Sequence, residues 1–216
     1  FAIKEALKNI NKFDKFGKRK GGLIWHTQGS GKSLTMVLLA KELNRTIPNS
    51  KIIIITDRIH LDKQIKNTFN NAGFKGNVVR AYSGNKLTDL LKEGKSSVIT
   101  TVINKFDNAM NKKLVINYSN IFVMVDESHR TQYGELHNKM KYVLPNACYI
   151  GFTGTPLMKK DKNSFDKFHR LLHKYPMDKA VNDGTVVPLL YESRNVPQEV
   201  DNNIIDEKFE LISKKL

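Results

Sequence analysis

The stretch HTQGSGKS has the residue types and spacing that phosphate binding requires, between the apolar residues LIW and a helical pattern. Gly29 and Gly31 can adopt backbone conformations that other residues avoid, which lets successive N–H groups point into one concavity. Lys32 stands at the expected start of the helix, where its ammonium would reach outer phosphates and the helix dipole also favours an anion. The Ser33 hydroxyl is placed to bind Mg²⁺. These features predict a phosphate-binding loop.

A second stretch, IFVMVDE, ends a run of apolar residues in two acids, Asp126 and Glu127. At the end of a core strand, Asp126 can hold Mg²⁺, while Glu127 can orient and deprotonate a water aimed at the terminal phosphate. Acids at strand ends also occur as helix caps. Two acids after five apolar residues, downstream of GSGKS, instead favour catalysis, and together the two stretches predict a nucleoside triphosphatase.

Apolar segments of strand length alternate with helical patterns and would position these groups. The expected strands are 22–25, 51–56, 77–82, 97–102, 121–126 and 148–153. Most are continuous apolar runs, which is typical of strands that are covered by helices on both faces. Helical spacing joins Leu61, Ile65 and Phe69, and also Leu136, Met140 and Leu144. The alternation predicts an α/β fold with a mostly parallel sheet and helices on both faces.

The chain after the last of these strands has a different pattern. We expect a charged helix over 159–174, a strand over 186–192 and a helix over 205–216. If the first of these is helical, His169 and His173 lie one turn apart and could share a metal, although histidines that pack or face solvent are commoner.

Composition limits the class of protein. The 216 residues carry a net charge of +15, with a pI near 9.8. This charge favours a polyanionic partner, but a bias of the composition toward lysine explains it equally well. The longest apolar runs are far too short to span a membrane, and no signal peptide opens the chain. Its single cysteine, Cys148, is expected in the core, which fits a reducing cytoplasm. Because the chain begins with Phe1, we expect a fragment of a longer protein.

Several motifs identify a family. Lys32-Ser33, DESH at 126–129 and FTGTP at 152–156 resemble the first three motifs of superfamily 2 helicases and translocases. The chain is more closely similar to the motor (R) subunit of type I restriction enzymes. The stretches that carry this resemblance, in order and spacing, are GGLIWHTQGSGKSLTM (21–36), TDRIHLDKQ (56–64), TTVINKF (100–106), VDESHRTQYG (125–134), GFTGTPL (151–157) and AVNDGTVVPLLYESR (180–194). His26, which replaces the usual first glycine of the phosphate loop, is part of the resemblance.

The resemblance implies a RecA-like P-loop domain and three segments. Residues 1–20 would form an N-terminal helix and a basic linker, 21–190 the first RecA-like ATPase domain, and 191–216 an exit toward a second motor domain. That second domain, with the arginines that complete the ATP site, and a nuclease domain would belong to the same polypeptide outside this chain.

The resemblance also implies roles for individual residues. The residues expected to cradle ATP are His26, Thr27, Gln28, Gly29, Ser30, Gly31, Lys32 and Ser33. Ser33 and Asp126 would hold Mg²⁺, and the catalytic set would be Lys32, Asp126, Glu127, His129 and Arg130. Coupling between the ATP site and the DNA track would fall to Gln132, Thr153, Gly154 and Thr155, with Arg58, Thr100 and Thr101 nearest the DNA backbone.

The expected activity is therefore ATP-driven translocation on double-stranded DNA, with modification and specificity subunits as further partners and no membrane. Two alternatives remain open at this point. One is a helicase that separates DNA or RNA strands. The other is a non-catalytic module that binds nucleic acid through its charge and carries a vestigial phosphate loop.

Overall fold

The structure is a computed structural model, and it describes residues 1–56, 65, 67–69, 71–74, 78–93, 97–126, 133–155 and 170–188. The chain divides into two compact units, Phe1–Val186 and Val187–Leu216. Every helix and strand described below belongs to the first unit.

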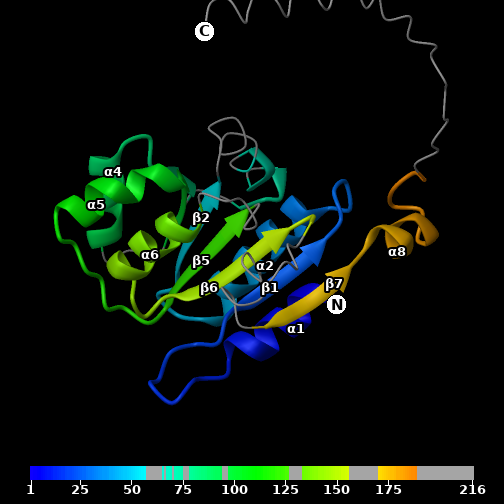
Figure 1. Cartoon of the computed structure of the whole chain (residues 1–216), viewed down its shortest axis with the longest axis horizontal. Coiled ribbons are helices and arrows are strands. Elements are labelled where there is room, and N and C mark those ends of the chain that lie inside the picture. Colours follow the sequence, from blue (N-terminus) through cyan, green and yellow to red (C-terminus); the bar gives the residue numbers. More distant parts are fainter. Residues whose placement is uncertain are drawn as a thin grey trace, which may run out of the picture. The chain divides into compact units, whose positions relative to one another are not determined.

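Within the described residues, seven strands form one sheet in which all neighbours are parallel (Figure 1). The strands are β1 (Gly22–His26), β2 (Lys51–Thr56), β3 (Val78–Arg80), β4 (Ser97–Val102), β5 (Ile121–Asp126), β6 (Cys148–Thr153) and β7 (Leu171–Tyr175). Their order across the sheet is β3-β4-β2-β5-β6-β1-β7. The predicted α/β class with a mostly parallel sheet is confirmed.

The six expected strands are all present, and β2, β4, β5 and β6 have the predicted bounds. The helix expected over 159–174 is wrong at its end, because Leu171–Tyr175 is a strand that pairs with β1 at the edge of the sheet formed by the described residues. Pairing with β1 overrides the helical pattern of this half-exposed segment. His173 therefore does not lie one helical turn from His169, and His169 is outside the described residues. The strand expected over 186–192 is absent at 186–188, and its remainder is also outside them.

The helices cover both faces of the sheet, as predicted (Figure 1). They are α1 (Ala2–Ile10), α2 (Lys32–Thr46), α4 (Gly84–Lys92), α5 (Phe106–Asn111), α6 (Tyr133–Val143) and α8 (Met177–Asn182), with a 3-10 turn at Ile103–Lys105. None of these described helices is long and apolar enough to cross a membrane.

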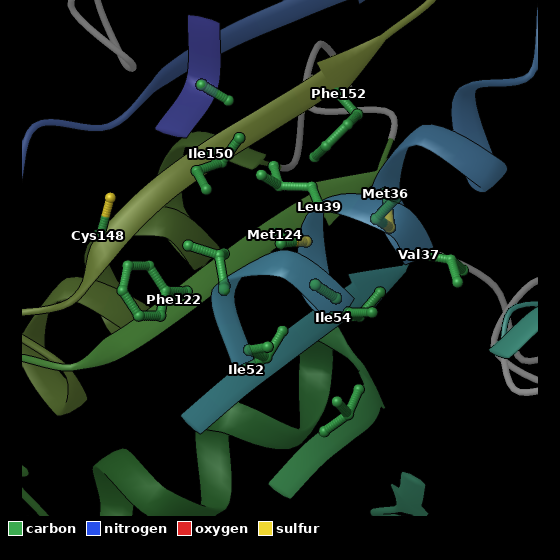
Figure 2. Packing of buried hydrophobic residues seen from close by; sticks show 14 of the residues in the cluster. Met36, Val37, Leu39, Ile52, Ile54, Phe122, Met124, Cys148, Ile150 and Phe152 are labelled. Atoms are coloured by element: carbon green, nitrogen blue, oxygen red, sulfur yellow. The ribbon is translucent and has the colours of Figure 1, made fainter. Parts of the chain in front are cut away.

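Alternate strand residues build two separate cores. Ile52 and Ile54 face α1 and α2, whereas Ile53 and Ile55 face α4, α5 and α6. Figure 2 shows the first core, where α2 packs on β2, β5 and β6. Cys148 lies in this core, as expected, and burial raises the pKa of its thiol to about 12. The continuous isoleucine run of β2 is thus explained by burial on both of its sides.

The N-terminal segment is anchored to the sheet rather than independent of it. Asn9 of α1 is buried, and its side-chain amide donates to the carbonyls of Lys20 and Gly21, directly before β1. The side-chain oxygen of Asn9, Oδ1, accepts a hydrogen bond from the guanidinium of Arg170, which lies directly before β7. One buried side chain therefore fixes α1 against the amino ends of two strands.

The carboxyl ends of the parallel strands lie along one edge of the sheet. β1 leads into α2 on one face, whereas the chain after β5 leads to α6 on the other face. In parallel α/β sheets, ligands bind at the carboxyl edge where the connections diverge in this way. The edge therefore positions the end of β1 and the end of β5 around a common space.

Candidate functional site

The loop between β1 and α2 has the backbone geometry of an anion site. Gly29 has φ 82° and Gly31 has φ 83°, both in the left-handed region that favours glycine. Gly31 is also the N-cap residue of α2. Because it has no side chain, it offers no acceptor to the first N–H groups of the helix. Ser30 closes the loop by donating from its hydroxyl to the Thr27 carbonyl at 2.6 Å.

The central contact of the site joins Lys32, the first residue of α2, to Asp126, the last residue of β5. Lys32 Nζ lies 3.2 Å from Asp126 Oδ1, and the two side chains are only 13% and 8% exposed. The sequence predicted that the ends of these two strands converge, and this is confirmed. Because the pair is largely desolvated, its attraction is much stronger than that of a surface ion pair.

The residues present fit a magnesium–nucleotide. The N–H groups of the first turn of α2, to which Gly31 offers no side-chain acceptor, and the Lys32 ammonium suit phosphate oxygens. The Asp126 carboxylate and the hydroxyl of Ser33, the second residue of α2, are hard oxygen ligands of the kind that Mg²⁺ prefers. The Asp126 charge is balanced by Lys32 in this structure.

Residues 153–155, the last residue of β6 and the two that follow it, lie beside the end of β1. Trp25 of β1 donates from its indole Nε1 to the Gly154 carbonyl at 3.1 Å. A Cβ built on Gly154 would lie 3.5 Å from the Gln28 backbone nitrogen. Thr153 is fully buried and accepts the Thr155 N–H at 3.2 Å through Oγ1. Of the four residues expected to carry coupling, Gly154 therefore lies against the loop and Thr153 pairs with Trp25 directly before it. The coupling role of these residues stays a prediction.

The His26 ring is directed to β7. Its Nε2 lies 3.0 Å from Nδ1 of His173, and its ring also meets the Tyr175 ring edge-on at 5.7 Å. Burial lowers the pKa of His26 to about 4, with smaller effects from His173 and Lys32, so the imidazole is neutral. His26 is one of the eight residues expected to bind ATP, and its side chain contacts His173 and Tyr175 of β7.

The sequence indicated His173 only as a possible metal partner of His169 on an expected helix over 159–174, and it did not indicate Tyr175 at all. The only signal that could have located them is the alternation of LLHKY, which is too short to stand out. Lys174, between them, lies over the Trp25 ring with Nζ 4.6 Å from its centroid.

Thr100 and Thr101, two of the expected DNA contacts, lie inside the sheet, and their role toward DNA stays a prediction. Both residues are fully buried in β4, between β2 and β3. Their β-branched side chains serve the interior of the sheet. Arg58, the third expected DNA contact, lies outside the described residues.

Four further expected residues also lie outside the described part of the chain, namely Glu127, His129, Arg130 and Gln132. They directly follow Asp126, whose position at the carboxyl edge is described. Their roles in water activation and coupling remain predictions.

The comparisons with known proteins agree with this geometry. The family model described as SWI2/SNF2 ATPase matches residues 1–216, the whole chain. The chain belongs to the SWI2/SNF2 ATPase family. The expected resemblance to type I restriction enzymes is also confirmed by curated relatives of this SWI2/SNF2 chain.

One such relative is a putative type I restriction enzyme MjaIXP endonuclease subunit of Methanocaldococcus jannaschii. It is 33% identical over 225 residues, which cover 100% of this chain and 21% of that protein. Another is the type I restriction enzyme HindI endonuclease subunit of Haemophilus influenzae, 37% identical over 198 residues that cover 82% of this chain and 19% of that protein. The chain spans about a fifth of the length of these relatives.

Solved structures share the fold. A nuclease-deletion mutant of the Type ISP restriction-modification enzyme LlaGI, in complex with a DNA substrate mimic, matches with a TM-score of 0.62 and 16% identity, over 85% of this chain and 20% of that one. The Sulfolobus solfataricus SWI2/SNF2 ATPase core in complex with dsDNA matches with a TM-score of 0.58 and 14% identity. The match covers 77% of this chain and 33% of that one. These likenesses confirm the RecA-like fold of this SWI2/SNF2 domain.

Proposed function

We propose that this chain is the ATP-binding and ATP-hydrolysing motor domain of a type I restriction enzyme, and that it drives translocation on double-stranded DNA. The observation that carries the proposal is the 3.2 Å contact of Lys32 with Asp126 beside a loop of two left-handed glycines. The similarity to type I restriction endonuclease subunits supports the rest.

In this proposal the chain's own groups bind and orient the triphosphate. The N–H groups of the loop and of the first turn of α2 hold the phosphates, and Lys32 leaves Asp126 to contact the outer ones. Asp126 and Ser33 would hold Mg²⁺, which neutralises charge on the phosphates when bound. The buried setting of Lys32 and Asp126 strengthens these interactions, because the local dielectric is low.

Glu127 follows Asp126 directly and would orient the attacking water. The arginines that stabilise the transition state would come from a second motor domain of the same polypeptide. Because an arginine supplied in this way accelerates such reactions by about 10³- to 10⁵-fold, the 216-residue chain alone should hydrolyse ATP slowly.

Double-stranded DNA is the proposed track, held mainly through its phosphates and without sequence preference. The net charge of +15 supports this partner. The shared fold occurs in a restriction-modification enzyme in complex with a DNA substrate mimic and in a SWI2/SNF2 ATPase core in complex with dsDNA, which supports this partner. Recognition of a DNA site and methylation would belong to separate specificity and modification subunits.

Hydrolysis by the chain alone gives the first test. We expect a slow release of phosphate from ATP that DNA increases little and that Lys32→Ala abolishes. Fast, DNA-stimulated turnover by the 216-residue chain would contradict the need for a second domain, and turnover unaffected by Lys32→Ala would contradict the site.

A second experiment separates translocation from strand separation. The protein for this experiment joins this domain to the second motor domain of a related subunit. It is tested on two DNA substrates. One is a duplex with a third strand bound along it, and the other is a duplex in which one strand is nicked and can be displaced. A translocase should remove the third strand and leave the duplex intact. Release of the displaceable strand would identify a helicase instead, and activity on neither would favour a binding module.

A further inference from the structure

The edge strand β7 contacts the phosphate loop through residues that no nucleotide motif includes. It pairs in parallel with β1, with Ile24 opposite His173 and His26 opposite Tyr175. Because Ile24 and His26 point to the same face of the sheet, the His26 side chain can reach His173 diagonally across the two strands. The end of β1, where the loop begins, is therefore held from β7.

The side-chain contact is a hydrogen bond between two histidines. His26 Nε2 and His173 Nδ1 are 3.0 Å apart, and the two rings meet at 64° with centroids 5.1 Å apart. His26 is only 6% exposed, and its other nitrogen, Nδ1, has no hydrogen-bond partner among the described residues. A buried N–H without an acceptor is costly, so the proton of neutral His26 belongs on Nε2. His26 then donates and His173 accepts.

The backbone of β7 and the helix that follows it, α8, hold Thr27, the residue after His26. The Thr27 N–H donates to the Tyr175 carbonyl at 2.9 Å, and the Thr27 hydroxyl lies 3.9 Å from the sulfur of Met177, the first residue of α8. The Tyr175 hydroxyl in turn donates to Asp183 at 2.9 Å, just beyond the end of α8. Strand and helix thus form one support under the start of the loop.

We propose that His173 and Tyr175 are positioning residues for nucleotide binding, which hold His26 and Thr27 so that the loop N–H groups converge on the phosphates. This inference rests on the proposed ATP site. A loop that must hold phosphates within a fraction of an ångström needs support from residues that do not touch the ligand. β7 supplies that support by a side-chain hydrogen bond to His26 and a backbone hydrogen bond to Thr27.

The test compares variants of His173 in the full 216-residue chain by their affinity for ATP in the presence of Mg²⁺. His173→Phe removes the acceptor for His26 and should weaken binding about five- to tenfold, the equivalent of one buried hydrogen bond. His173→Asn keeps an acceptor near the position of Nδ1 and should restore most of the affinity. His173→Gln moves that acceptor by one methylene and should behave like His173→Phe, which covers the case that the phenylalanine variant does not fold.

Leu172→Ala is the matched control. Leu172 lies on the same strand and packs into the core, so its truncation lowers stability without touching the loop. It should leave the ATP affinity within about twofold of the original. A second readout is amide hydrogen exchange, in which ATP should slow exchange over 171–186 in the original chain and much less in His173→Phe, because linkage is reciprocal.

The outcomes separate the two proposals. No ATP binding by the original chain would overturn the proposed function itself. ATP binding that is unchanged in both His173→Phe and His173→Gln would overturn the positioning role alone. Equal losses of affinity in Leu172→Ala and the His173 variants would also overturn it, since they would reflect general destabilisation.

Discussion

The indole Nε1 of Trp25 donates to the Gly154 carbonyl at 3.1 Å, which joins the strand that enters the phosphate loop to the segment that follows β6. Trp25 is the only tryptophan of the chain. Its ring also lies under the Lys174 ammonium, at 4.6 Å. A rearrangement of the loop or of residues 153–155 would therefore change the surroundings of a single fluorophore.

We predict that ATP with Mg²⁺ changes the intrinsic fluorescence of Trp25 in a saturable way. The change should be absent in Lys32→Ala, which removes the group expected to contact the outer phosphates. A steady-state fluorescence titration, run beside an independent binding measurement, checks this. If ATP binds but the emission does not move, the contact of Trp25 with Gly154 does not report on the nucleotide.

The left-handed glycine at the start of α2 gives a second prediction. Gly31 and Gly17 have φ of 83° and 73°, and an added Cβ would meet no atom within 4 Å at either. Alanine at each position should therefore lower the free energy of unfolding by about 1 to 2 kcal/mol through backbone strain alone. Only Gly31→Ala should also weaken ATP binding, by about tenfold, because it distorts the loop. Similar ATP affinities for the two variants, measured by calorimetry beside urea unfolding, would contradict this.

The buried lysine of β2 has a structural role that a third experiment can isolate. Lys51 Nζ donates to the carbonyls of Leu90, Leu91 and Glu93 at the end of α4, and burial lowers the pKa of Lys51. Lys51→Met should lower the free energy of unfolding by about 1 to 3 kcal/mol, because it leaves helix carbonyls without a donor. The exposed Lys92 of α4 is the matched control, and Lys92→Met should change stability by less than about 0.5 kcal/mol. Equal urea midpoints for the two variants would refute the capping role.

The buried His26 predicts how stability depends on pH. Burial lowers its pKa from 6.5 to about 4, so between these values the unfolded chain binds a proton that the folded chain does not. The free energy of unfolding should be greatest above pH 6.5 and fall as the pH drops through this window, with His26 contributing about 1 to 3 kcal/mol. The pKa of His173 is also lowered by burial and acts in the same direction.

The measurement is urea unfolding of the original chain and of His26→Gln at about pH 7.5 and about pH 5. The original chain should lose more stability between the two values than the variant, which has no imidazole to protonate. Parallel losses would assign the pH dependence to other groups.

Strands buried on both faces were the most predictable part of the fold. β2, β4, β5 and β6 are continuous runs of apolar and β-branched residues, and such runs have few alternatives inside an α/β domain. The contact between Lys32 and Asp126 could also be predicted, because parallel strands bring their carboxyl ends to one edge of the sheet.

The rest depended on contacts that sequence spacing does not encode. β7 is a strand because it pairs with β1 along the sheet edge, and its half-buried sequence has no strong pattern of its own. The hydrogen bond of His26 to His173 follows from that pairing and was therefore missed. Thr100 and Thr101 were placed near DNA by family resemblance, but their position inside β4 buries them.

The central claim is that Lys32 and Asp126 form a nucleotide site, and direct calorimetric titration with ATP and Mg²⁺ tests it best. The original chain should bind, and Lys32→Ala should weaken binding at least about tenfold, since it removes a charged contact to phosphate. Lys41→Ala, an exposed lysine farther along the same helix, should bind like the original. No binding by the original chain, or equal affinities of Lys32→Ala and Lys41→Ala, would contradict the account.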